Sequence, residues 1–146
     1  MIRAATLADV PALVDLGRAM HAESERFSRL QFDPERLAAT LRLAIERHFA
    51  QVVDVDGKLI GGMVALLTPH WFSPDLTACD LALFMTPECR GTIAAARLLN
   101  AYAFWARGHG SKLTLFGVMS GVHVEQTVAM CERLGWRRAG VVMERV

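Results

Sequence analysis

The chain has 146 residues, of which 53% are hydrophobic and 21% charged, and its formal net charge at pH 7 is +1. This length predicts a single domain over residues 1–146, and the apolar fraction excludes a disordered chain. A net charge so close to zero creates no positive field for a polyanion, which argues against nucleic acid as a partner.

The elements of the first half can be placed by their start signals. Residues 2–5 fit a short strand, and Thr6, with Asp9 three residues later, is typical of the start of a helix that runs to about Ala22. Residues 23–32 show no clear period and are expected to form a loop. A second helix begins at Asp33-Pro34, and its inner stripe consists of Leu37, Leu41, Ala44, Ile45 and His48.

From residue 51 onward the pattern changes to strands. Residues 51–55 and 59–67 are expected to pair through an Asp56-Gly57 hairpin turn. Residues 68–75 predict a loop that could act as a lid, and 77–86 a further strand. The remaining elements are a long helix over 91–109, a strand over 113–118, a helix over 124–134 and a closing strand over 138–145. This order predicts an α/β (α+β) fold in which helices cover both faces of a mixed sheet.

Targeting signals and cysteines indicate the compartment. No apolar run reaches the roughly 18 residues that a transmembrane helix requires, and Met1–Thr6 lacks the layout of a signal peptide. The three cysteines form no CxxC pair, and no two histidines have the spacing of metal ligands. We therefore expect a cytoplasmic protein that has no membrane partner and no metal.

The segment from Leu83 to Leu99 holds the most informative pattern. It combines a strand, a tight basic turn and a helix start made of small residues, so backbone N–H groups and the positive end of the helix dipole converge there. Such a place suits a pyrophosphate. The alternative is an ordinary joint between a strand and a helix, whose alanines pack against the sheet.

The same segment resembles the acetyl-CoA signature of the GCN5-related N-acetyltransferase (GNAT) family. It matches at Leu83, Phe84, Pro87, Glu88, Arg90, Gly91, Ala95, Leu98 and Leu99. It departs from the signature at Ile93, where the family usually has glycine. A second block, Cys131-Glu132-Arg133-Leu134-Gly135-Trp136, is similar to the family's Tyr-Glu-Arg-Leu-Gly-Phe.

The resemblance implies a mostly antiparallel sheet that holds acyl-CoA between two splayed parallel strands. Backbone groups of Leu83, Phe84 and Met85 would pair with the pantetheine arm. The N–H groups of Arg90, Gly91, Thr92, Ile93, Ala94 and Ala95 would hold the pyrophosphate. His123 stands where similar enzymes often carry an asparagine that contacts CoA, and is expected to replace that contact.

Two side chains are candidates for proton transfer in the acyl transfer that the resemblance implies. Asp80 is the only carboxylate in its strand, and its apolar surroundings would raise its pKa and favour a role as general base. The alternative is that Asp80 caps a strand end or pairs with an arginine. Cys131 stands where similar enzymes usually have the tyrosine that acts as the general acid. It is either a proton donor or an inert core residue.

The loop residues His70, Trp71 and Phe72 are the candidates for contact with the acceptor, unless they only anchor the loop to the body of the protein. The chain is thus expected to transfer acetyl from acetyl-CoA to a primary amine of a small molecule or peptide. The alternative is a non-catalytic sensor or scaffold of the same fold that binds acyl-CoA. Because the family often pairs through C-terminal strands or helices, a homodimer is among the expectations.

Overall fold

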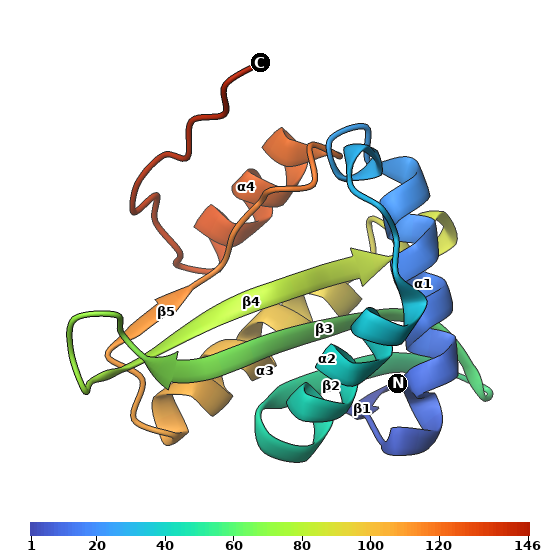
Figure 1. The fold of residues 1–146 in the computed structure, drawn as a ribbon, viewed down its shortest axis with the longest axis horizontal. Helices are drawn as coiled ribbons and strands as arrows, with labels where there is room; N and C mark the ends of the chain where they lie inside the picture. The colour runs from blue at the N-terminus through green and yellow to red at the C-terminus, as the bar shows by residue number, and fades with distance from the viewer.

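The computed structural model describes residues 1–146, which form one five-stranded sheet with strands in the order of the chain (Figure 1). Neighbouring strands are antiparallel except for the last pair, which is parallel. This confirms the predicted mixed, mostly antiparallel sheet. The strands are β1 (Ile2–Ala4), β2 (Phe49–Val55), β3 (Lys58–Pro69), β4 (Leu76–Met85) and β5 (Leu113–Leu115).

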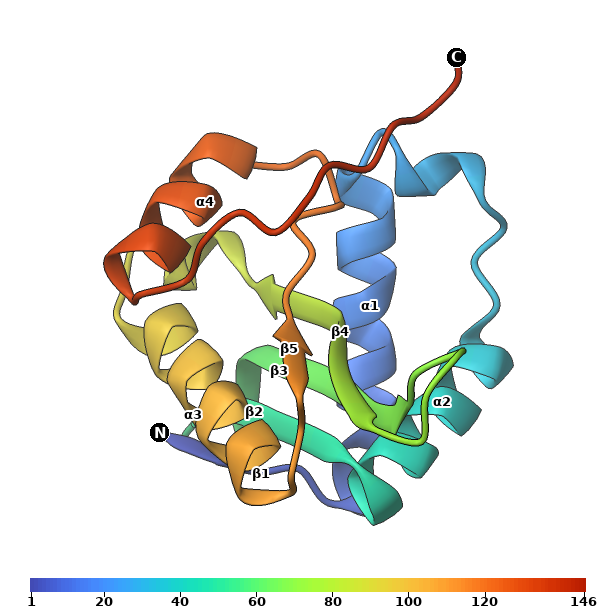
Figure 2. The ribbon, with the colours of Figure 1, turned by 90° about the vertical axis from the view of Figure 1, so that its left-hand side faces the viewer.

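Helices cover both faces of the sheet, as the order of elements predicts. The first two helices lie against one face and the third against the other, while the fourth follows β5 (Figures 1 and 2). None of the helices has the length and apolarity needed to cross a membrane. The helices are α1 (Val10–Glu23), α2 (Pro34–Arg47), α3 (Ala94–Gly108) and α4 (Val124–Arg133).

Alternation along the strands builds a separate core on each face. Val52 of β2 packs into the core under α1 and α2, and the next residue, Val53, packs into the core under α3. Successive side chains point to opposite faces of a sheet, so neighbouring residues serve different cores. The α3 core also receives Tyr102 and the α4 residue Cys131.

The predicted helix starts and the first hairpin turn are present. The Asp33 carboxylate accepts the N–H groups of Glu35 and Arg36 at the start of α2, and Asp9 accepts the N–H of Thr6. Asp56 and Gly57 have φ angles of 51° and 85°, the left-handed conformation that a type I′ turn requires at both positions.

Two helix and strand limits differ from the sequence-based expectation. The third helix begins at Ala94 rather than residue 91, since Gly91 adopts a φ of +79° that no α-helix accommodates. The strand expected over 113–118 ends at Leu115. It ends there because the N–H of Gly117 is bonded to a side chain of β4 rather than to a strand partner.

The closing strand expected over 138–145 does not form, and that prediction is wrong. The tail after α4 pairs with no strand, and it leads away from the body of the protein to the C-terminus (Figures 1 and 2). Glu144 fixes it instead, through ion pairs of 2.6 Å with Arg26 and 2.9 Å with Arg29.

Candidate active site

Strands β4 and β5 run side by side for only part of their length. Their parallel pairing joins Thr77–Cys79 to Leu113–Leu115, whereas β4 continues to Met85 and the chain after β5 turns away toward α4 (Figure 1). From residue 80 onward, one edge of β4 therefore has no partner strand. The N–H and C=O groups of such an edge can bond an extended ligand as they would another strand.

A bulge in β4 turns Asp80 toward the α3 face of the sheet. In the β3–β4 register Val64 opposes Ala82, but Ala65 opposes Asp80, so Leu81 is the additional residue. Without the bulge, Asp80 would share a face with Ala82, because side chains alternate along a strand. With the bulge, it lies on the side of Ala65, which belongs to the core under α3.

The Asp80 carboxylate lies at the point where β4 and β5 separate. Its Oδ1 accepts a 2.7 Å hydrogen bond from the N–H of Gly117, just beyond β5. Burial raises the pKa of Asp80 to about 6, although the bond from Gly117 acts in the opposite direction. No ion pair of the structure includes Asp80, so the expected alternative of an arginine partner is not realised.

Two more polar side chains from the helices lie near Asp80. Tyr102 of α3 is fully buried and donates its hydroxyl to the Leu115 carbonyl at 2.8 Å, which fixes the end of β5. Cys131 of α4 is buried in the same core, and burial raises the pKa of its thiol, with a further increase from the charge of Asp80. Sequence reasoning assigned Tyr102 only to the apolar face of its helix. Its isolation as the one tyrosine of the chain was the available signal.

The loop between β4 and α3 presents unused backbone donors. The N–H groups of Gly91, Thr92, Ile93, Ala95 and Ala96 make no hydrogen bond within the protein. Ile93 is 62% exposed, and a Cβ added at Gly91 would meet no atom within 4 Å. These donors at the start of a 15-residue helix form a cradle for an anion.

Two residues of the expected cradle are engaged elsewhere. The N–H of Arg90 bonds to the Pro87 carbonyl at 3.3 Å, and the N–H of Ala94 to the Thr92 hydroxyl at 3.4 Å. The free donors are therefore the five N–H groups at residues 91, 92, 93, 95 and 96. Ala96, which sequence reasoning left out, is one of them.

The Arg90 side chain turns back from this loop toward α1. Its guanidinium forms a 2.6 Å ion pair with Glu23 and donates to the Met85 carbonyl at 3.2 Å. Arg90 lowers the pKa of Glu23, and the charge of His123 lowers it further. His123 lies at the N-terminus of α4 and has a φ of 49°, in the left-handed region.

The predicted acceptor residues His70, Trp71 and Phe72 lie at the opposite end of β4. They form the tip of the β3–β4 hairpin, where the His70 N–H bonds to the Asp75 carbonyl, so the segment is a tight turn rather than a lid. The Trp71 and Phe72 rings meet edge to face at 4.9 Å and stay exposed. They do not anchor the turn to the body of the protein.

The segment between α1 and α2 closes one end of the gap. Ser24 donates its hydroxyl to the Ser120 carbonyl at 2.5 Å, and Arg26 donates to the Met119 carbonyl at 2.8 Å. These bonds hold the end of α1 against the loop that follows β5. Phe27 and Leu30 of the same segment also line a cavity on the α1/α2 face of the sheet.

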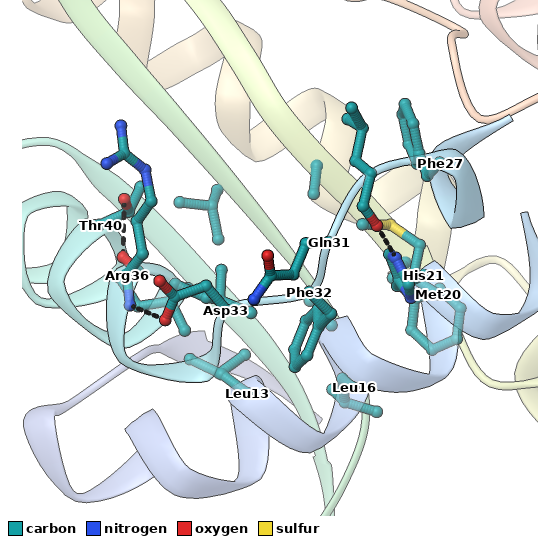
Figure 3. A pocket seen from close by; sticks show the side chains of 18 residues that line it. Leu13, Leu16, Met20, His21, Phe27, Gln31, Phe32, Asp33, Arg36 and Thr40 are labelled. Atoms are coloured by element: carbon teal, nitrogen blue, oxygen red, sulfur yellow. Dashed lines mark hydrogen bonds between the residues drawn. The ribbon is translucent and has the colours of Figure 1, made fainter.

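A cavity of about 330 Å³ lies on the α1/α2 face of the sheet (Figure 3). Its walls come from α1, α2, the segment between them, and the β3 and β4 residues Gly62, Val64, Ala82 and Phe84. Sequence reasoning missed it, because its walls come from three separate stretches of the chain, residues 13–41, 62–64 and 82–84. Nowhere in the structure are three or more His, Cys, Asp or Glu side chains grouped as a metal site would need.

Comparison with known proteins gives one family. The family described as Acetyltransferase (GNAT) matches residues 16–136, most of the chain. A search of curated proteins found no match.

Solved structures share the fold at low sequence identity. AAC(6')-Iy in complex with the bisubstrate analogue CoA-S-monomethyl-acetylneamine is 14% identical, with a TM-score of 0.77 over 100% of this chain and 96% of that one. An aminoglycoside acetyltransferase from an uncultured soil sample, in complex with sisomicin, is 15% identical, with a TM-score of 0.71 over 100% and 95%. A transcriptional regulator from Bacillus halodurans C-125 is 14% identical, with a TM-score of 0.78 over 100% and 98%.

Proposed function

This chain belongs to the Acetyltransferase (GNAT) family and is an acyl-CoA-dependent N-acetyltransferase, and from that premise we propose that it uses acetyl-CoA to acetylate a primary amine of a small molecule or peptide. The observation that carries the proposal is the unpaired edge of β4, which leads from Asp80 to the free N–H groups of residues 91–93, 95 and 96. A strand edge that ends at an anion cradle matches a ligand with an amide-containing arm and a diphosphate.

The donor would be held by backbone groups. The edge of β4 at Leu83, Phe84 and Met85 would bond the amides of the pantetheine arm, and the five free N–H groups would bond the diphosphate. One group of this edge is already used, since the Met85 carbonyl accepts from Arg90. His123 would contact CoA from the start of α4, as the sequence predicts.

Asp80 is suited to accept the proton of the amine. Acetyl-CoA, when bound, supplies the thioester that the amine attacks. An amine nitrogen must lose a proton as it forms the amide bond, and Asp80 Oδ2 is the carboxylate oxygen that Gly117 leaves free. With a pKa of about 6, this carboxylate is ionised at pH 8, and it is a stronger base than an exposed aspartate.

Cys131 is suited to supply a proton to the leaving thiolate. Its raised pKa keeps Sγ protonated at neutral pH, as a proton donor requires. Donor and acceptor would both be thiols, so the proton would pass between groups of similar ordinary pKa. The alternative role, that of a core residue, rests on the burial of Cys131 in the core under α3, and the kcat of Cys131→Ala distinguishes the two.

We retain the hairpin tip as a proposed contact for longer acceptors. Trp71 and Phe72 expose aromatic surface in the turn before β4, and the first residue of β4, Leu76, already lies four strand residues, or about 13 Å, from Asp80. A peptide acceptor would be long enough to reach both places. Replacing both rings by alanine should then raise the KM of a peptide acceptor and leave that of a short amine unchanged.

Compartment and assembly are also proposals. The three free cysteines, with Cys79 exposed, support a reducing cytoplasm. The open edge of β5 and the exposed tail residues Val141, Val142 and Met143 support a homodimer. Sedimentation velocity at several protein concentrations would test for the dimer. A single species of monomer mass at every concentration would exclude it.

Two measurements on the intact protein test the proposed activity. Acetyl-CoA should raise the unfolding temperature in a concentration-dependent manner, because a ligand that binds only the folded state stabilises it. Chromatography should then detect CoA release with at least one compound of a broad amine panel. Binding without release to any amine would favour the non-catalytic sensor, and no stabilisation at millimolar acetyl-CoA would exclude both alternatives.

A further inference from the structure

We infer that the acceptor is a monoamine with an apolar alkyl or aryl body, and that the cavity on the α1/α2 face holds this body. The inference rests on the proposed function, since it names the class of acceptor for that reaction. It is carried by the apolar walls of the cavity, by its position beside β4 and by the absence of a net negative charge among the lining residues.

The walls of the cavity are mainly hydrocarbon. Eleven of its 18 lining residues are hydrophobic, and Leu13, Leu16, Met20 and Phe27 contribute side chains from α1 and the segment after it (Figure 3). A volume of about 330 Å³ lies at the lower end of the range for small-molecule sites. Such walls gain free energy mainly by removing apolar ligand surface from water.

The segment that covers the cavity is held in a defined conformation. His21 bonds through Nε2 to the Leu30 carbonyl at 2.7 Å, and its ring lies 5.4 Å from that of Phe32. The Arg18 guanidinium lies over the Phe32 ring, 4.9 Å from its centre. These contacts keep the segment folded over α1, so the cavity is formed without a ligand.

The cavity also adjoins the part of β4 that has no partner strand. Ala82 and Phe84 line it, and Ala82 lies two residues, or about 7 Å, from Asp80 along the strand. Because β4 has no partner strand on this edge from residue 80 onward, a ligand on either face of the sheet can approach the edge. An amine whose body lies in the cavity can therefore reach over this edge to the side of Asp80.

The charges around the cavity do not suit a polycation. Its only carboxylate is Asp33, whose Oδ1 accepts the first N–H groups of α2, and Arg36 on the same helix carries the opposite charge. A compound with several ammonium groups would leave most of them unpaired against apolar walls, which is costly. The cavity thus favours one amine over many, although a solved structure of the same fold was obtained in complex with sisomicin.

The test is a series of linear primary amines from propylamine to hexylamine, with sisomicin and spermidine as polycationic comparisons. If the cavity takes the chain, kcat/KM should rise about fourfold for each added CH₂ group, and the polycations should react more slowly than hexylamine. This series uses the unmodified protein, so it does not depend on the folding of any variant.

A matched pair of variants locates the effect. Thr40 lines the cavity, whereas Leu43 lies on the same helix, exposed and outside the cavity. Thr40→Phe should abolish the dependence on chain length without changing the KM of acetyl-CoA, and Leu43→Phe should keep it.

The outcomes separate this inference from the proposed function. A flat alkyl series together with acetylation of sisomicin or spermidine would overturn the apolar acceptor and leave the activity intact. An unchanged slope in Thr40→Phe would also overturn it. Binding of acetyl-CoA without CoA release to any amine would refute the proposed function, and the acceptor class with it.

Discussion

Asp80 Oδ1 accepts a 2.7 Å hydrogen bond from the backbone N–H of Gly117, and this contact spans β4 and β5 at the point where they part. The carboxylate is positioned by the bulge at Leu81 on one side and by this single N–H on the other. One of its oxygens is thus held in place while the second is available. The partial burial that raises its pKa to about 6 also makes it costly to ionise.

Replacing Asp80 by asparagine should remove the base and preserve the structure. The amide oxygen of Asn can still accept from Gly117, so the geometry of the gap is kept. We expect kcat to fall by about 10²–10⁴-fold, the usual contribution of general base catalysis, with the dissociation constant of acetyl-CoA unchanged. A variant that kept the kcat of the unmodified protein would remove Asp80 from the mechanism.

The raised pKa of Asp80 also predicts a dependence of stability on pH. The carboxyl group has a pKa near 3.8 when unfolded and about 6 when folded, so its protonated form favours folding. That contribution is fully present below pH 3.8 and is lost as the pH rises through about 6. Asp80→Asn should therefore be more stable than the unmodified protein at pH 8, by about 1–3 kcal/mol, and similar to it at pH 3.5.

Denaturant unfolding at these two pH values measures the difference. The Asp80→Asn variant is the reference for this comparison, because its amide has the same charge at both pH values. An equal difference in unfolding free energy at both pH values would show that Asp80 titrates as an ordinary exposed aspartate.

A carboxylate placed at residue 93 should weaken the binding of acetyl-CoA without weakening the fold. Ile93 is exposed and precedes α3, where a negative charge interacts favourably with the helix dipole by about 0.3–1 kcal/mol. Ile93→Asp would place this charge among the N–H groups of the cradle and repel a diphosphate. Titration calorimetry should show acetyl-CoA affinity reduced at least tenfold, with an unfolding temperature that is equal or higher.

Ile93→Asn is the matched control, since it has the same shape and no charge. It should bind acetyl-CoA nearly as well as the unmodified protein. If both variants lost affinity equally, the loss would come from the isoleucine side chain and not from repulsion in the cradle.

Replacing the Cys131 thiol tests whether it donates a proton. Cys131→Ala should lower kcat at least tenfold and leave the dissociation constant of acetyl-CoA unchanged, because the proton for the leaving thiolate would be missing. Cys131→Ser keeps a side-chain proton at the same position and should retain a larger kcat than Cys131→Ala. A similar kcat in both variants would identify Cys131 as a core residue only.

The sequence predicts the elements well because their signals are local. The carboxylates of Asp9 and Asp33 mark helix starts, and Asp56-Gly57 marks a turn, through contacts within three residues. Asp80 was a candidate from its position in an apolar strand. The orientation of its side chain depends on the bulge at Leu81, and no residue type in this strand predicts a bulge.

Features that depend on distant contacts were out of reach. A closing strand was expected in the tail after α4, but the position of the tail is set by the ion pair between Arg26 and Glu144, 118 residues apart. In the same way, the cradle could be placed near Arg90. Which N–H groups are free depends on the short turn at Pro87–Cys89 and on the Thr92 hydroxyl.

Backbone amide NMR of the labelled protein during titration with CoA observes each proposed N–H donor of the cradle individually. The account predicts that the largest shifts belong to Gly91, Thr92, Ile93, Ala95 and Ala96, with saturation at the dissociation constant found by calorimetry. Saturating CoA that left these five resonances in place, or that moved only residues remote from the gap, would contradict it.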